Sequence, residues 1–223
     1  MAETIKIAGA DGFEFSAYHE PSFTPRKGGV IVIQEIFGLD EHVRADVERW
    51  AKMGYEAIAP SMFDRREPGF LAKHDEAGMK AGIAHLMGTP MDQALGDIAA
   101  CAAFLRTRGQ KVCIVGYCYG GSLAWLAAGK VDGLAAASSY YGSMVQANAA
   151  LTLHCPTIVH LGRTDGHIPA DEVAAAVAEH HADVPVYIYE GAGHGFNNES
   201  PERYSAEAAD LARHRTLELF DKA

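Results

Sequence analysis

The chain has 223 residues, 48% of them hydrophobic, which suits a single domain over residues 1–223 and excludes a chain that is disordered or embedded in a membrane throughout. The formal net charge of −10, from 19 Lys and Arg against 29 Asp and Glu, argues against a nucleic-acid partner. No secretory leader, membrane-spanning apolar run or metal-type C-x-x-C pair is visible, so we expect a cytoplasmic protein with free thiols and no bound metal.

Strand and helix patterns alternate along almost the whole chain. Two segments at residues 5–8 and 13–18 predict a hairpin that turns at Asp11-Gly12. The run GGVIVIQE at residues 28–35 is continuously apolar until its end, as in a strand buried on both faces. Further strands are predicted at residues 55–60, 111–117, 134–141, 157–161 and 185–190, and helices at about 42–52, within 64–87, and at 91–108, 120–128, 170–181 and 203–220.

This alternation predicts an α/β fold, a mostly parallel twisted sheet with helices on both faces. Ligand sites in such sheets lie beyond the carboxyl ends of the strands. Functional side chains are therefore expected just after residues 35, 60, 117, 161 and 191.

The sharpest local motif is Gly116-Tyr117-Cys118-Tyr119-Gly120, which follows one predicted strand and opens a helix. It matches the nucleophile elbow G-x-S-x-G with sulfur in place of oxygen. The two glycines would leave room where neighbouring Cβ atoms would collide, and the helix N-terminus would favour a thiolate at Cys118. Taken alone, the motif could equally be a tight turn that contains a buried cysteine.

Two weaker motifs follow later strands. Asp165 could hold a histidine through its ring N–H, or it could be an ordinary turn or cap aspartate. His194 lies among glycines that would let its loop return over the sheet, although it could also be a plain loop histidine. The order Cys118, Asp165, His194 is the nucleophile–acid–base order of the α/β-hydrolase fold, which favours a catalytic triad. His167, near Asp165, is the rival base, and His160 is expected to be a hydrogen-bonded core residue.

Glu35 closes the apolar strand in the motif Gln34-Glu35-Ile36-Phe37, where an unpaired carboxylate would be costly. The backbone N–H groups of Ile36 and Tyr119 could form an oxyanion hole beside it. The alternative is a structural ion pair between Glu35 and either Arg44 or Arg65.

Six motifs together resemble the dienelactone hydrolases (carboxymethylenebutenolidases), a family of α/β-hydrolases, from about residue 5 to the C-terminus. The motifs are QEIFGL at 34–39, APSMF at 59–63, VGYCYGG at 115–121, YYG at 140–142, GRTD at 162–165 and GHGF at 193–196.

The resemblance implies that Cys118 attacks a lactone carbonyl to form a thioester, with His194 moving protons and Asp165 orienting it. It also implies that Ile36 and Tyr119 bind the oxyanion, that Glu35 holds the resting thiol, and that neither cofactor nor metal takes part. Members of the family bind a substrate carboxylate with two arginines. One matches Arg65, whereas Asn198 stands in the place of the other; Phe37 and Tyr140 are further substrate-binding candidates.

The sequence thus predicts a hydrolase of small activated carboxylic esters, with an enol lactone such as dienelactone the favoured substrate. The alternatives are a general carboxylesterase or thioesterase acting on neutral substrates and a non-catalytic ligand-binding or redox-responsive protein of the same fold. The expected partner is a small-molecule ester or lactone, with the chain a monomer or a small homo-oligomer.

Overall fold

Eight strands form one sheet in the order β1-β2-β4-β3-β5-β6-β7-β8. A computed structural model describes residues 1–199 and 202–223 of the chain. The first two strands form an antiparallel hairpin, β2 pairs antiparallel with β4, and the strands from β4 to β8 across the sheet run parallel. The strands are β1 (Glu3–Ala8), β2 (Glu14–Glu20), β3 (Gly28–Ile33), β4 (Tyr55–Pro60), β5 (Val112–Tyr117), β6 (Ala136–Tyr140), β7 (Thr157–Gly162) and β8 (Val186–Tyr189).

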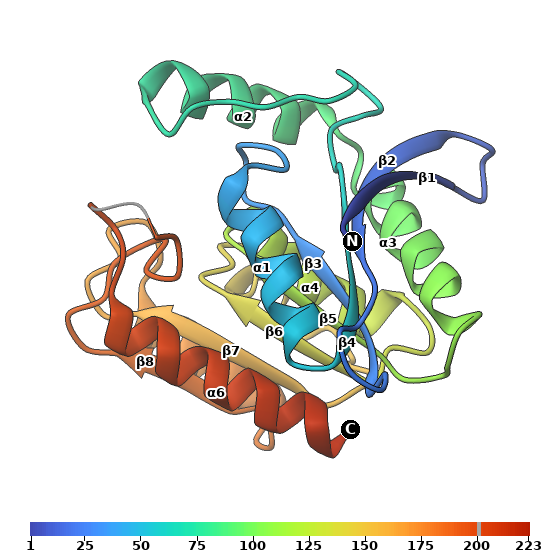
Figure 1. The fold of residues 1–223 in the computed structure, drawn as a ribbon. Helices are drawn as coiled ribbons and strands as arrows, with labels where there is room; N and C mark the ends of the chain where they lie inside the picture. The colour runs from blue at the N-terminus through green and yellow to red at the C-terminus, as the bar shows by residue number, and fades with distance from the viewer. Residues whose placement is uncertain (200–201) are drawn as a thin grey trace.

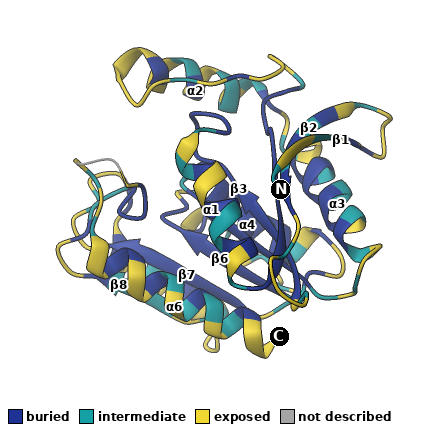
Figure 2. Ribbon diagram, viewed as in Figure 1, coloured by how far each residue is buried: buried dark blue, intermediate teal, exposed yellow. Residues whose placement is uncertain are grey.

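Helices cover both faces of the sheet, which confirms the predicted α/β fold (Figure 1). On one face, α1 (Glu41–Lys52) and α6 (Ala206–Lys222) meet where the rings of Trp50 and Phe220 lie 5.2 Å apart. On the other face lie α3 (Met91–Arg106), α4 (Tyr119–Lys130) and α5 (Ala170–His180). Every residue of β3, β4, β5, β6 and β7 is buried (Figure 2), as expected of parallel strands covered on both sides.

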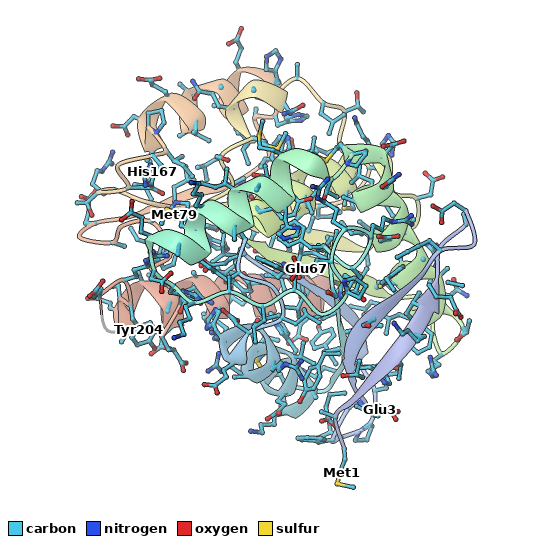
Figure 3. All side chains as sticks on the ribbon, turned by 90° about the horizontal axis from the view of Figure 1, so that it is seen from above. Met1, Glu3, Glu67, Met79, His167 and Tyr204 are labelled. Carbon is cyan, nitrogen blue, oxygen red and sulfur yellow. The ribbon has the colours of Figure 1, made fainter. Side chains whose placement is uncertain are left out.

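Helix α2 (Glu76–Gly88) lies outside these two layers, across the top of the molecule (Figure 3). Its two buried residues are glycines, Gly78 and Gly82. A Cβ at Gly82 would lie 2.3 Å from the carbonyl oxygen of Ile36, so the helix backbone rests directly on the loop that follows β3. This loop and the loops after β5, β6 and β7 meet at the carboxyl edge of the sheet.

The observed elements differ from the predicted ones mainly at their ends. β3 stops at Ile33, two residues earlier than expected, because the carbonyl oxygen of Gln34 accepts from the N–H of Gly120 in α4 rather than from a neighbouring strand. Helix α6 begins at Ala206 instead of residue 203, and a short 3₁₀ helix, η1 (Gln146–Asn148), was not expected. Of the helices described, none has the length and apolar character needed to cross a bilayer.

Candidate active site

Cys118 lies at a sharp bend between β5 and α4. Its φ of 55° is in the left-handed region, which non-glycine residues seldom adopt. The bend holds together because the N–H of Cys118 donates to the carbonyl of Tyr140, at 3.0 Å, and its carbonyl accepts from the N–H of Ser122, at 3.1 Å. The strand, turn and helix thus follow one another as the sequence predicts.

The two glycines of the elbow are needed for steric reasons. A Cβ at Gly116 would lie 1.9 Å from the carbonyl oxygen of Gly120. A Cβ at Gly120 would lie 2.3 Å from the carbonyl oxygen of Ile33, at the end of β3. Any side chain at either position would therefore force the turn and the neighbouring strand apart.

His194 is held by Asp165 from the loop after β7. The ring Nδ1–H donates to Asp165 Oδ2 at 2.8 Å. The other carboxylate oxygen accepts from the backbone N–H groups of His167, at 2.8 Å, and Ile168, at 3.2 Å. These bonds fix the carboxylate on both oxygens, so the imidazole is presented in one orientation with its Nε2 free for chemistry. His167 contributes its backbone to Asp165, whereas its ring lies 5.7 Å from that of His194.

Cys118 lies close to His194 and favours its protonated form. Burial lowers the pKa of His194, but Asp165 and Cys118 outweigh burial and raise this pKa to about 10. Burial likewise works to raise the pKa of Asp165, yet the hydrogen bond and charge of His194 hold it below its usual value. Cys118 is only partly buried, so part of the residue is open to solvent.

Glu35 lies beside this group with an amide as its partner. Asn198 Nδ2 donates to Glu35 Oε2 at 3.0 Å, whereas Glu35 Oε1 is buried without a partner among the residues described. Neither arginine considered as an ion-pair partner reaches this carboxylate: Arg44 donates to the carbonyl of Leu39, and Arg65 bonds elsewhere. The two residues expected to act on a carboxylate-bearing substrate, Glu35 and Asn198, therefore bind each other. A groove of about 860 Å³ borders Asn198 on its outer side.

Two backbone N–H groups, those of Ile36 and Tyr119, are the candidate donors of an oxyanion hole. Within the described ranges, the N–H groups of Ile36 and Tyr119 make no hydrogen bond. Tyr119 is the first residue of α4, where backbone N–H groups have no partner inside the helix. Ile36 follows the end of β3, and that strand neighbours β5. The two donors thus come from adjacent strand ends.

Arg65 bonds two carboxylates, the buried Asp97 and the exposed Asp11. Its guanidinium donates to both oxygens of Asp97, at 2.9 and 2.7 Å, and to both oxygens of Asp11, at 2.6 and 3.1 Å. The side chain is 10% exposed and stacks on the ring of Phe13, 4.5 Å from its centroid. Arg65 would have to leave one of these partners to bind a substrate carboxylate.

The two remaining substrate-binding candidates, Tyr140 and Phe37, lie in different surroundings. The hydroxyl of Tyr140 contacts Thr216 of α6 at 2.9 Å, on the face of the sheet away from α4. The ring of Phe37 is buried and stacks on His74, with centroids 3.9 Å apart, next to Ile36. Tyr141, which belongs to the motif YYG but was given no role from the sequence, has its ring centroid 5.1 Å from that of His194.

A fully buried carboxylate supports the elbow from the α1 side. Asp46 accepts from the hydroxyl of Tyr117 at 2.6 Å and from Arg213 of α6. Arg213 also donates to Asn197 at 3.3 Å. This network connects the residue before Cys118 with the loop that supplies His194.

The other thiols lie away from this site. Burial raises the pKa of Cys113 to about 12 and that of Cys155 to about 11, and it also raises the pKa of Cys101. His160 is a core residue, as expected, with contacts of 2.8 Å to Tyr189 and 3.1 Å to Thr216. Over residues 1–199 and 202–223, no cluster of His, Cys, Asp and Glu is arranged to hold a metal ion.

Comparison with known proteins points to one family. The model of the dienelactone hydrolase family matches residues 15–223. The carboxymethylenebutenolidase of Pseudomonas putida is 32% identical over 231 residues, covering 99% of this chain and 96% of its own, and that of Pseudomonas knackmussii gives the same values. A crystal structure of dienelactone hydrolase type from Klebsiella pneumoniae superposes with a TM-score of 0.87 at 28% identity, covering 100% of this chain and 99% of that one.

Proposed function

This chain belongs to the dienelactone hydrolase family, and on that premise we propose that it hydrolyses a small activated carboxylic ester through a thioester on Cys118. The observation that supports this most directly is the 2.8 Å hydrogen bond by which Asp165 orients His194, close to Cys118. An enol lactone is the favoured substrate class because an enolate leaves readily and a thioester then forms readily.

In the first half of the reaction, the sulfur of Cys118 bonds to the carbonyl carbon. The carbonyl electrons move to its oxygen, where the N–H groups of Ile36 and Tyr119 stabilise the negative charge. When the carbonyl re-forms, the bond to the leaving oxygen breaks and the imidazolium of His194 supplies that oxygen with a proton. In the second half, His194 takes a proton from water as the water attacks the thioester, and the thiolate leaves.

Glu35 supplies negative charge close to the sulfur, held by the neutral amide of Asn198. This carboxylate is a candidate acceptor for the thiol proton of Cys118. Glu35 would leave Cys118 free to attack as a thiolate only when a substrate displaces or repels the Glu35 carboxylate. Hydrolysis of amides, whose leaving groups are poor, should be much slower than that of esters.

The partners of Arg65 and Asn198 favour a second candidate, an esterase or thioesterase that acts on neutral substrates. Asp11 and Asp97 occupy the guanidinium of Arg65, and Glu35 occupies the amide of Asn198. A substrate carboxylate would have to compete with these partners. A hydrolysis screen that pairs anionic lactones with neutral esters of matched leaving groups separates the two candidates.

The nucleophile is tested by turnover of p-nitrophenyl acetate together with intact-protein mass. We expect the parent to accumulate one acetyl group and Cys118→Ala to lose activity by on the order of 10³-fold or more, as removal of a nucleophile does elsewhere. Cys155→Ala, at a partly buried thiol outside the site, is the matched control and should keep parental turnover. Equal turnover in Cys118→Ala and the parent would remove Cys118 from the mechanism.

A non-catalytic role is tested by the rate at which iodoacetamide alkylates the protein. A triad cysteine should react faster than a free thiol, and the advantage should disappear in His194→Ala. Labelling no faster than that of a free thiol, with no dependence on His194, would favour a ligand-binding protein of the same fold.

A further inference from the structure

Tyr141 combines two unusual features at the active site. Within residues 1–199 and 202–223, it and Cys118 are the two non-glycine residues with positive φ, 39° for Tyr141. Its side chain is fully buried, and its hydroxyl has no hydrogen-bond partner among the residues described. Strained backbone and unpartnered buried polar groups are both rare, and both concentrate where a protein binds or reacts with a ligand.

The adjacent tyrosine differs in this respect. Tyr140 is equally buried, yet its hydroxyl contacts Thr216 at 2.9 Å. Burial, followed by the charge of Glu35, raises the pKa of Tyr141 well above its usual value. The phenol therefore remains protonated at any working pH, so it is available as a hydrogen-bond donor.

The order of strands in the sheet places Tyr141 on a definite side of the nucleophile. Cys118 follows β5, which lies between β3 and β6. The possible oxyanion donors, Ile36 and Tyr119, lie toward the β3 side, where Gly120 bonds Gln34. Tyr141 follows β6, and the N–H of Cys118 bonds the residue before it. Its ring is 5.1 Å from that of His194, on the side from which the proton for the leaving group comes.

We propose that Tyr141 is a catalytic residue whose phenol O–H donates a hydrogen bond to the leaving-group oxygen. As the bond between the carbonyl carbon and this oxygen breaks, its electron pair stays on the oxygen. The hydrogen bond from Tyr141 stabilises that growing negative charge, while the proton that completes the alcohol or enol comes from His194. Tyr141 keeps its own proton throughout. This inference rests on the proposed acyl transfer to Cys118.

The hydrogen bond should matter more when the leaving group is more basic. In Tyr141→Phe, which keeps the ring, we expect kcat/KM for p-nitrophenyl acetate to fall by less than about 10-fold. For ethyl acetate we expect a fall of about 100-fold, the scale observed when a donor to a developing oxyanion is removed. Phenyl acetate and trifluoroethyl acetate should fall between these values, because the loss should rise with the pKa of the leaving alcohol.

Tyr140→Phe is the matched control, since it removes a buried tyrosine hydroxyl at the neighbouring position and should give the same small change for every ester. A loss in Tyr141→Phe that is uniform across the four esters would overturn the proposal and instead indicate that the hydroxyl positions another group, such as Glu35. No loss for any ester would also overturn it. Failure of the proposed function is a separate result: it would appear as parental turnover that Cys118→Ala does not diminish.

Discussion

Replacement of Asp46 by asparagine should destabilise the whole protein, although the two side chains have nearly the same size. Asp46 is completely buried and accepts from Tyr117, Trp50, Arg49 and Arg213. Burial works to raise its pKa, but Arg213 and the surrounding donors hold the pKa below its usual value, so the group is an anion in the folded protein. Asparagine would remove the charge and turn one acceptor into a donor.

The expected loss of stability follows from the unpaired charge that the substitution leaves on Arg213. The side chain of Arg213 is 16% exposed, so Asp46→Asn leaves a largely buried cation without its anion. Breaking a buried ion pair from one side costs about 3–5 kcal/mol. Against a total free energy of unfolding of about 5–15 kcal/mol, the variant would lose about a fifth of its stability or more.

Urea unfolding of the parent and the variant at pH 7 measures this loss. Glu199→Gln is the control, because Glu199 pairs with Arg49 at the surface, where it is 52% exposed, and should cost less than about 1 kcal/mol. A double variant, Asp46→Leu with Arg213→Met, should lose less than the sum of its single changes, since it leaves no unpaired charge. A loss below about 1 kcal/mol in Asp46→Asn, or strict additivity in the double variant, would refute the reasoning.

Three further predictions concern the site and its supports. The pKa of His194 is about 10 in the folded protein against an ordinary 6.5, so the unfolded chain releases this proton first. The stability that His194 contributes should therefore be complete below pH 6.5 and disappear by about pH 10. The measurement is the difference in unfolding free energy between the parent and His194→Gln across that range. A difference that stays constant with pH would contradict the raised pKa. In Arg65→Ala, Asp97 loses its partner, so we expect lower stability in urea and equal KM changes for anionic and neutral esters; a KM rise confined to carboxylate-bearing substrates would instead assign Arg65 to the substrate. Gly120→Ala should cost about 1–3 kcal/mol by overpacking against Ile33 and slow the alkylation of Cys118 by iodoacetamide, and unchanged values of both would show that the turn tolerates a Cβ.

The order of the elements could be predicted from the sequence because parallel strands leave continuous apolar runs and glycines stop the helices. The pairing of Asp165 with His194 could be predicted for a related reason. Both residues lie just past a strand, and the carboxyl ends of parallel strands converge on one edge of the sheet. His194 and Asp165 are 29 residues apart in sequence and 2.8 Å apart in space.

Other features depend on contacts that no local pattern records. Asp46 and Arg213 are 167 residues apart, and the sequence around either residue does not indicate that the two form an ion pair. The two carboxylates that hold Arg65 come from a hairpin turn and from a helix. Tyr140 and Tyr141 are identical neighbours in the sequence. Only the bend after β6 decides that the hydroxyl of Tyr140 contacts α6 and that the ring of Tyr141 lies near His194.

The left-handed conformation of Cys118 belongs to the main chain rather than to the sulfur. Main-chain hydrogen bonds to Tyr140 and Ser122 hold the bend at residue 118, so a serine there would inherit the same position. Exchange of the two atoms would therefore compare the reactivity of a thiol and an alcohol on one unchanged frame. The main chain fixes the position of this side-chain atom, whereas the residue type decides whether the atom is sulfur or oxygen.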